Sequence, residues 1–183
     1  MVKTAVRADS ARTIDTVLHV AAQLLAEDPG VSLVAIAAKA GVDRRTVYRH
    51  FEYRESLVDT IYRTAYAAAD EAMNDARLED APVVVAMHRL FEGLVTVIRR
   101  YPMGRPQPDS AIYALHERYE ERFATFLRRA TDEGALRAGL PDGLALEVFQ
   151  KTLWLLALHF RELEPGPVAD LAVDILLNGL GTH

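Results

Sequence analysis

The residues of this chain with the clearest capacity for chemistry form a short run of hydrogen-bond donors. Guanidinium, hydroxyl and imidazole groups at this density can donate to phosphate oxygens and to acceptors on the edges of bases. The sequence therefore predicts a surface that binds DNA. The alternative is a solvated polar face on a short structural helix. The donors are Arg44, Arg45, Thr46, Tyr48, Arg49 and His50.

Catalysis is the main alternative of a different class. The chain has no cysteine, which excludes disulfides, thiolate zinc sites and cysteine nucleophiles. His88 and Glu92, and likewise His116 and Glu120, are four residues apart and could hold a metal from one helix face. Neither pair belongs to a metal-binding motif, and no glycine-rich phosphate loop is present. We therefore expect no enzymatic activity, no cofactor and no metal, with a helical metal-dependent enzyme as a remote alternative.

The segment Leu33–Phe51, which contains the donors, has the features of a helix-turn-helix. Such a motif needs a small residue in its first helix so that the second can cross closely, and Ala37 meets this need. It also needs a glycine that tolerates left-handed backbone at the turn, followed by an apolar residue that fills the corner. Gly41 and Val42 stand in that order.

Capping and packing residues frame the two helices of this motif. Ser32 can cap the first helix and Asp43 the second. Val47 and Phe51 are four residues apart and can pack the second helix onto Ile36. The donor side chains are then left on the outer face.

The rest of the 183 residues repeats helical spacing of apolar residues and shows no sustained alternation. The expected class is all-α, with about nine helices. We predict a DNA-binding domain over residues 1–55 and a helical bundle for ligand binding and dimerisation over 56–183. A fourth helix of about 54–76 links them, and the last two helices are expected over about 144–163 and 168–180. Pro106 and Pro108 exclude continuous helix between the fifth and sixth.

Charge is distributed unevenly along the chain. Residues 1–51 hold seven Lys and Arg against five Asp and Glu, whereas the whole chain has a net charge of −5. A basic N-terminal segment in an otherwise acidic chain is typical of a protein that binds a polyanion through one end. No secretory signal is visible, and the longest apolar run, Leu153–Phe160, is far short of the roughly 18 residues of a membrane span. We expect a cytoplasmic protein without membrane contact.

The N-terminal third, about residues 10–60, resembles the TetR family of transcription regulators. The resemblance lies in Ser32-Leu33, Ile36-Ala37, Ala40-Gly41-Val42, Thr46-Val47-Tyr48-Arg49-His50-Phe51 and Glu55-Ser56-Leu57. It implies a DNA-binding regulator, here expected to be a repressor. A helix-turn-helix regulator that answers to a protein partner, with no small-molecule inducer, remains the alternative.

The resemblance also implies roles for individual residues. Arg44 and Arg45 match positions that meet bases, and because arginine pairs with guanine acceptors a guanine-containing operator is expected. Arg54 stands where the family has a lysine that reaches a phosphate, and Tyr53-Arg54 departs from the usual pair at this point. Thr46, Tyr48 and His50 match positions that contact the DNA backbone. Arg49 and Ser32 complete the predicted DNA-binding set.

The last two expected helices are apolar on more than one face. A single small domain can cover only one of these faces and would leave the other exposed to solvent. A partner chain that covers the second face predicts a homodimer, and its two-fold symmetry would suit a palindromic operator. The alternative is a monomer with a thoroughly buried core helix. The predicted interface residues are Leu153, Leu156, Phe160, Leu171, Ile175 and Leu177.

Aromatic and sulfur-containing residues accumulate between the fourth and eighth expected helices. By resemblance to the family, this region encloses a pocket for a small effector of unknown identity, apolar or aromatic in character. The alternative is that these side chains simply form a helical core. The predicted ligand-binding residues are Tyr62, Tyr66, Met73, Met87, Phe91, Tyr113, His116, Tyr119, Phe123 and Trp154.

Overall fold

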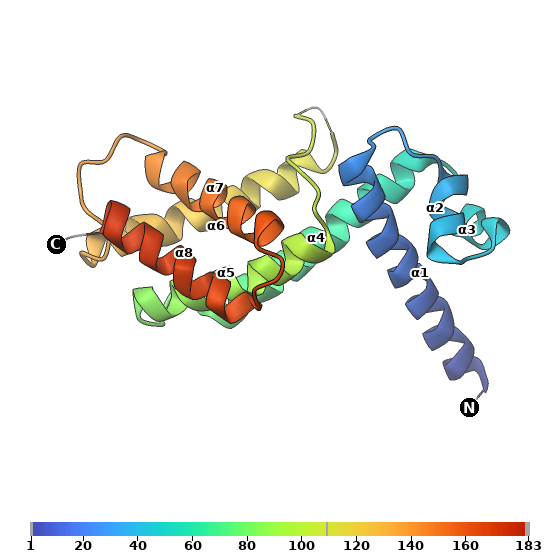
Figure 1. Ribbon diagram of the computed structural model, residues 1–183, viewed down its shortest axis with the longest axis horizontal. Coiled ribbons are helices and arrows are strands. Elements are labelled where there is room, and N and C mark those ends of the chain that lie inside the picture. Colours follow the sequence, from blue (N-terminus) through green and yellow to red (C-terminus); the bar gives the residue numbers. More distant parts are fainter. Residues whose placement is uncertain (1, 109, 182–183) are drawn as a thin grey trace. The chain divides into compact units, whose positions relative to one another are not determined.

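The computed structural model of the chain describes residues 2–108 and 110–181, with only the backbone described for residues 2–10. It confirms the all-α class (Figure 1). The described residues form no strand, and their one isolated β-bridge joins Leu136 and Gly181. The helices are α1 (Val2–Glu27), α2 (Leu33–Ala40), α3 (Arg44–His50), α4 (Arg54–Ala76), α5 (Val83–Arg100), α6 (Tyr113–Asp132), α7 (Leu144–His159) and α8 (Pro165–Leu180).

The described part of the chain has eight helices, so the expected number of about nine was too high. The segment between α5 and α6 forms no helix, as the sequence predicted. It contains Pro102, Pro106 and Pro108, which lack a backbone donor and restrict the residues before them.

Two boundaries also differ from the sequence prediction. The last helix begins at Pro165, because proline is tolerated in the first turn, where its missing N–H has no partner within the helix. The helix before it ends at His159 rather than near residue 163.

The chain divides into two compact units, which are described separately. Unit 1 comprises Met1–Thr64 together with Arg100–Pro106, and unit 2 comprises Ala65–Arg99 together with Gln107–His183. The helix α4 thus contributes its first half to unit 1 and its second half to unit 2. The predicted domain boundary after residue 55 lies before this division.

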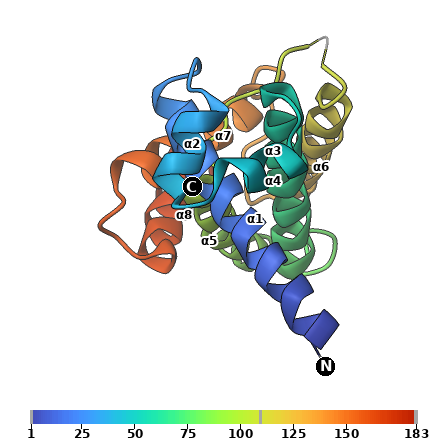
Figure 2. The ribbon, with the colours of Figure 1, turned by 90° about the vertical axis from the view of Figure 1, so that its right-hand side faces the viewer.

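In unit 1, α1 packs against α2 and α2 packs against α3 (Figure 2). The buried apolar residues of α1 recur at three- and four-residue steps, which places them on one face of the helix. Leu33 and Ile36 of α2, Val47 of α3, and Leu57 and Ile61 in the first half of α4 are buried as well. The buried residues of α1 are Val17, Leu18, Ala21, Ala22 and Leu25.

Unit 2 is built around a larger apolar core from α5 to α8 and the second half of α4. Gly93 of α5 permits close approach to α4, since a Cβ atom there would lie 2.8 Å from the Cβ of Ala72. Arg99, at the end of α5, donates hydrogen bonds to the carbonyl oxygens of Ala157 (3.2 Å), Phe160 (2.8 Å) and Leu163 (2.8 Å). These bonds satisfy carbonyl groups that the end of α7 leaves without helical partners.

No helix of the described residues is long and apolar enough to cross a membrane.

Candidate nucleic-acid interface

The turn between α2 and α3 depends on Gly41. This residue has φ +65° and ψ +27°, a left-handed conformation that costs residues with a Cβ atom roughly 1–2 kcal/mol. Its N–H donates to the carbonyl of Ala38 (3.2 Å), and the N–H of Val42 donates to that of Ala37 (3.0 Å). The turn therefore closes α2 and redirects the chain into α3.

Side chains cap the first turn of both helices. The hydroxyl of Ser32 accepts a hydrogen bond from the N–H of Ala35 (3.2 Å), and the carboxylate of Asp43 accepts one from the N–H of Arg45 (2.7 Å). Such caps stabilise a helix by about 1 kcal/mol. Ser32, one of the predicted DNA contacts, is thus exposed and also holds the start of α2.

The recognition helix α3 has one buried and several exposed residues. Val47 is fully buried, and Phe51, just after the helix, is buried as well. The predicted donors are exposed, except that Thr46 is half-buried. Within the part of the chain that the structure describes, the side chains of Arg44, Arg45 and Arg49 have no hydrogen-bond or ion-pair partner. Their guanidinium groups are therefore free to donate to a ligand.

Arg54 lies differently from the prediction. Its guanidinium group donates to the carbonyl of Pro29 in the connection between α1 and α2, and its Nε atom is buried. The side chain is held against its own unit instead of extending outward, as the predicted phosphate contact requires. The planar fork of arginine suits such a carbonyl better than the point charge of lysine does. The neighbouring Tyr53 is 56% exposed.

Several residues predicted for a ligand pocket meet in a polar cluster in unit 2. The hydroxyl of Tyr66 and the Nδ1 atom of His116 are joined by a hydrogen bond of 3.0 Å. The Nε2 atom of His116 lies 3.2 Å from a carboxylate oxygen of Glu120, which also accepts a hydrogen bond of 3.3 Å from Gln150. Sequence reasoning missed Gln150, because its spacing alone gives no signal that α7 meets α6 at this point.

Aromatic rings surround this cluster. The ring centroids of Tyr113 and His116 are 5.7 Å apart, those of Tyr66 and Tyr119 5.5 Å, and those of Tyr119 and Phe123 4.6 Å. Burial raises the pKa of Tyr119, and the nearby Tyr66, Asp70 and Glu120 raise it further. The phenol is therefore neutral over the physiological range.

The other predicted pocket residues lie elsewhere. Met73, Met87 and Phe91 are fully buried in the core of unit 2, and Trp154 is partly buried against it. Tyr62 belongs to unit 1, where burial raises the pKa of its phenol. The polar cluster therefore accounts for only part of the predicted set.

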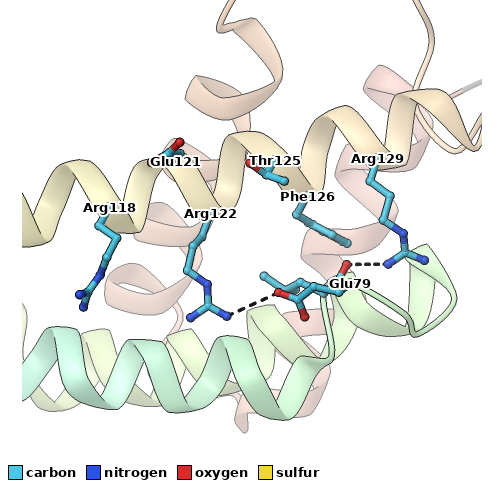
Figure 3. Close-up of a pocket in the computed structure, with 8 residues that line it drawn as sticks. Glu79, Arg118, Glu121, Arg122, Thr125, Phe126 and Arg129 are labelled. Carbon is cyan, nitrogen blue, oxygen red and sulfur yellow. Dashed lines mark hydrogen bonds and ion pairs between the residues drawn. The ribbon is translucent and has the colours of Figure 1, made fainter.

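A separate groove of about 250 Å³ runs between the end of α4 and α6 (Figure 3). Its lining includes three arginines of α6 and none of the residues predicted to bind a ligand. Arg118 and Arg122 both contact Asp70 of α4, at 2.9 and 3.2 Å, and Arg129 donates to the carbonyls of Leu78 and Ala81. The contacts of these arginines hold α6 to the end of α4.

The two histidine–glutamate pairs do not build a metal site. No group of three or more histidines and carboxylates suitable for a metal occurs among the residues described. His88 pairs with Asp170 of α8 at 3.0 Å, and His116 with Glu120 as given above.

The residues predicted for a dimer interface are split between core and surface. Leu153 and Leu156 are buried in the core of unit 2, so these two predictions need correction. The outer face of α7 carries Leu155 instead, which is 53% exposed. Phe160, Leu171 and Ile175 are exposed, and Leu177 is partly buried against the core.

Known proteins that are similar to this chain in sequence are transcription regulators and a nucleoid occlusion factor. Residues 17–61 match the family model for bacterial regulatory proteins of the tetR family. The HTH-type transcriptional repressor LfrR of Mycolicibacterium smegmatis is 28% identical over 176 residues, which cover 92% of this chain and 88% of that protein. The nucleoid occlusion factor SlmA of Marinobacter nauticus is 24% identical over 139 residues, 69% of this chain and 70% of that protein.

The fold is also shared with solved structures. The crystal structure of the TetR-like regulator LfrR from Mycobacterium smegmatis in complex with proflavine superposes with a TM-score of 0.72 and 24% identity, covering 97% of this chain and 99% of that one. The helix-turn-helix and the sequence matches together indicate a transcription regulator. Residues 17–61 thus match the TetR family, and the chain as a whole is similar in sequence to a repressor and in fold to a TetR-like regulator.

Proposed function

We propose that the protein is a cytoplasmic repressor that binds a palindromic operator as a homodimer and is released by a small aromatic ligand. Residues 1–55 would read the DNA, and residues 56–183 would bind the ligand and the partner. The observation that carries the proposal is the outer face of α3, where exposed donors have no partner among the described residues.

The positions of the donors along α3 support two roles, contact with bases and contact with phosphates. Arg44 and Arg45 stand at its start, where the N-terminal end of a recognition helix meets base edges in the major groove. The bidentate fork of arginine suits the O6 and N7 acceptors of guanine. Tyr48, Arg49 and His50 would donate to phosphates, as would Thr46, and so fix the register on the duplex.

Exposed apolar residues on α7 and α8 support a second copy of the chain as partner. Leu155, Phe160, Leu171 and Ile175 are 39–53% exposed, whereas other apolar residues of both helices, such as Leu156 and Leu176, are buried in the core. Leu171 and Ile175 lie one turn apart on α8, and neighbouring exposed apolar residues favour a protein interface. We expect L171E/I175E to be monomeric in sedimentation, with L144E, an equally drastic change at the start of α7, as the matched control.

The polar cluster of unit 2 supports the ligand class. Glu120 offers a carboxylate, and Tyr66, Tyr113 and Tyr119 offer rings on which a flat aromatic molecule can stack. The related LfrR has been crystallised with proflavine, a flat aromatic amine, which makes proflavine a suitable first probe.

The test begins with selection of duplex DNA from a random pool. The proposal predicts recovery of a palindrome, binding of two protomers per duplex, and weaker binding when proflavine is added. E120Q should reduce the response to proflavine, whereas E121Q, which changes the neighbouring exposed carboxylate, should not. Recovery of no preferred sequence would refute operator binding, and undiminished affinity in saturating proflavine would refute release by this compound.

A second candidate is a helix-turn-helix regulator that answers to a protein partner. Exposed apolar residues such as Leu171 and Ile175 would suit a different protein as well as a second copy of the chain. It predicts that operator affinity responds to a protein and not to proflavine or any other aromatic compound.

A further inference from the structure

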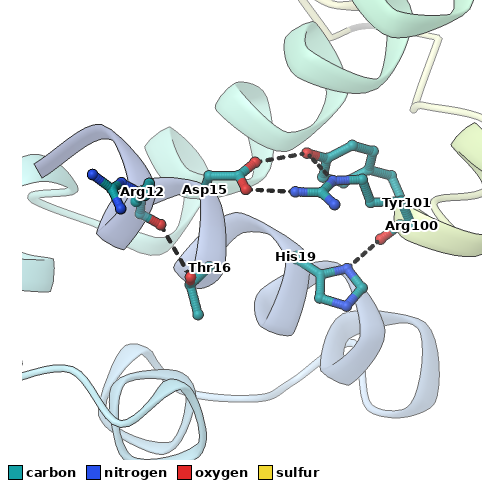
Figure 4. Close-up of polar contacts among 6 residues, drawn as sticks. All are labelled: Arg12, Asp15, Thr16, His19, Arg100 and Tyr101. Carbon is teal, nitrogen blue, oxygen red and sulfur yellow. Dashed lines mark hydrogen bonds and ion pairs between the residues drawn. The ribbon is translucent and has the colours of Figure 1, made fainter. Parts of the chain in front are cut away.

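A polar stripe on α1 holds the last residue of α5 (Figure 4). Asp15, His19 and Gln23 are spaced four residues apart, so they lie on one face of α1, away from the apolar face that packs on α2. All three contact Arg100, and Arg100 belongs to the same compact unit.

The contacts engage both the side chain and the backbone of Arg100. Its guanidinium group donates to the carboxylate of Asp15 (2.5 Å) and to the hydroxyl of Tyr101 (3.0 Å). Its carbonyl accepts hydrogen bonds from the Nδ1–H of His19 (3.0 Å) and from Gln23 (3.2 Å). Tyr101 is itself buried, and its hydroxyl lies 3.5 Å from Asp15.

This arrangement does more to orient α1 than to stabilise the fold. The side chains of Arg100 and Asp15 are 46% and 53% exposed, and ion pairs at that exposure contribute little to stability. Three contacts from α1 to this one residue nevertheless restrain both the position of α1 along its axis and its rotation. Since α1 packs on α2, and α2 on α3, the direction of the recognition helix depends on α1.

Arg99, the residue before Arg100, has its own hydrogen-bond partners in unit 2. Arg99 is bonded to three carbonyl groups at the end of α7 in unit 2, whereas Arg100 is bonded to α1 in unit 1. One peptide bond therefore joins a residue anchored on α7 to a residue anchored on α1.

We propose that Arg100, held by Asp15, His19 and Gln23, is a positioning residue for operator binding, because it holds α1, against which α2 of the helix-turn-helix packs. This inference rests on the proposed function, because operator affinity is its main readout. It assigns no DNA contact to Arg100 itself.

The test compares R100Q and D15N, with R161Q as the control that removes one exposed arginine without a contact among the described residues. Both R100Q and D15N should weaken binding to the selected duplex about tenfold, and the double variant should be no weaker than either. The D15N result is decisive, because removal of a negative charge would by simple electrostatics strengthen DNA binding. The slope of log affinity against log salt should stay that of the wild type, since no phosphate contact is lost.

Two outcomes would overturn the proposal. If R100Q weakens binding with a shallower salt slope while D15N binds as tightly as the wild type or more tightly, Arg100 acts as a charge facing DNA. If neither variant changes affinity, the contact does not position the recognition helix. A wild type that binds no duplex would refute the proposed function instead. Hydrogen exchange then still tests the contact, because residues 12–24 should exchange faster in R100Q and D15N than in R161Q.

Discussion

Two helices of this protein, α3 and α6, carry several arginines each and use them in opposite ways. On α3, Arg44, Arg45 and Arg49 are exposed, and their side chains have no partner among the described residues. On α6, by contrast, Arg118, Arg122 and Arg129 each contact side chains or carbonyl groups of the same unit.

The difference arises from what lies within reach of each guanidinium group. Asp70 and Asn74 of α4 lie opposite the first two arginines of α6, and the carbonyls of Leu78 and Ala81 are within 2.7 Å of Arg129. The outer face of α3 has no such acceptors. The number of arginines on a helix therefore does not identify a DNA-binding surface. A cluster of arginines without partners on the second helix of a helix-turn-helix, as on α3, favours one.

The largest expected effect comes from replacing two arginines on each helix in turn. R44A/R45A should weaken binding to the selected duplex at least 100-fold, because each bidentate contact to a base contributes about 1–3 kcal/mol. R118A/R122A, with the same loss of charge, should change that affinity less than threefold. Fluorescence anisotropy on a labelled duplex measures both, and equal losses would contradict the distinction between the helices.

In unfolding experiments, by contrast, a substitution on α6 should have a larger effect than one on α3. R129M removes two hydrogen bonds to carbonyl groups and one to Glu133, so it should lower the free energy of unfolding by about 3 kcal/mol. R49M on α3 should stay within about 0.5 kcal/mol of the wild type, as exposed substitutions usually do. Urea denaturation followed by circular dichroism measures both values. A larger loss in R49M would mean that α3 also uses its arginines within the fold.

A smaller effect, confined to alkaline pH, is expected from Tyr119 of α6. Burial raises the pKa of this phenol above its ordinary value of 10.0. Above pH 10 the unfolded chain therefore loses the proton while the folded chain keeps it, and stability falls as the pH rises. Y119F should flatten this fall relative to the wild type. Y53F, which alters an exposed tyrosine of unit 1, should not; thermal melts between pH 8 and 11 would show whether it does.

The sequence was sufficient for the features that depend on local spacing. The steps from Val17 to Leu25 predict the buried face of α1, and Gly41 predicts the left-handed turn before α3. The prediction of a TetR-like regulator is confirmed by the comparisons.

Features that depend on residues far away in the chain could not be predicted from local spacing. Arg54 turns inward because the carbonyl of Pro29 lies beside it, 25 residues earlier in the chain. Similarly, the second half of α7 is apolar on all sides, so periodicity could not show that Leu153 and Leu156 are buried while Leu155 is exposed. Asp15, His19 and Gln23 do have a readable four-residue spacing, but their partner Arg100 lies more than 75 residues away.

The most direct test of DNA binding by α3 is the salt dependence of wild-type affinity for the selected duplex. Each phosphate contact contributes about −0.9 to the slope of log affinity against log salt. Two recognition helices with several donors each predict a slope steeper than about −4 for the dimer. A slope near zero would mean that the exposed donors of α3 do not meet phosphates, and it would contradict the central claim.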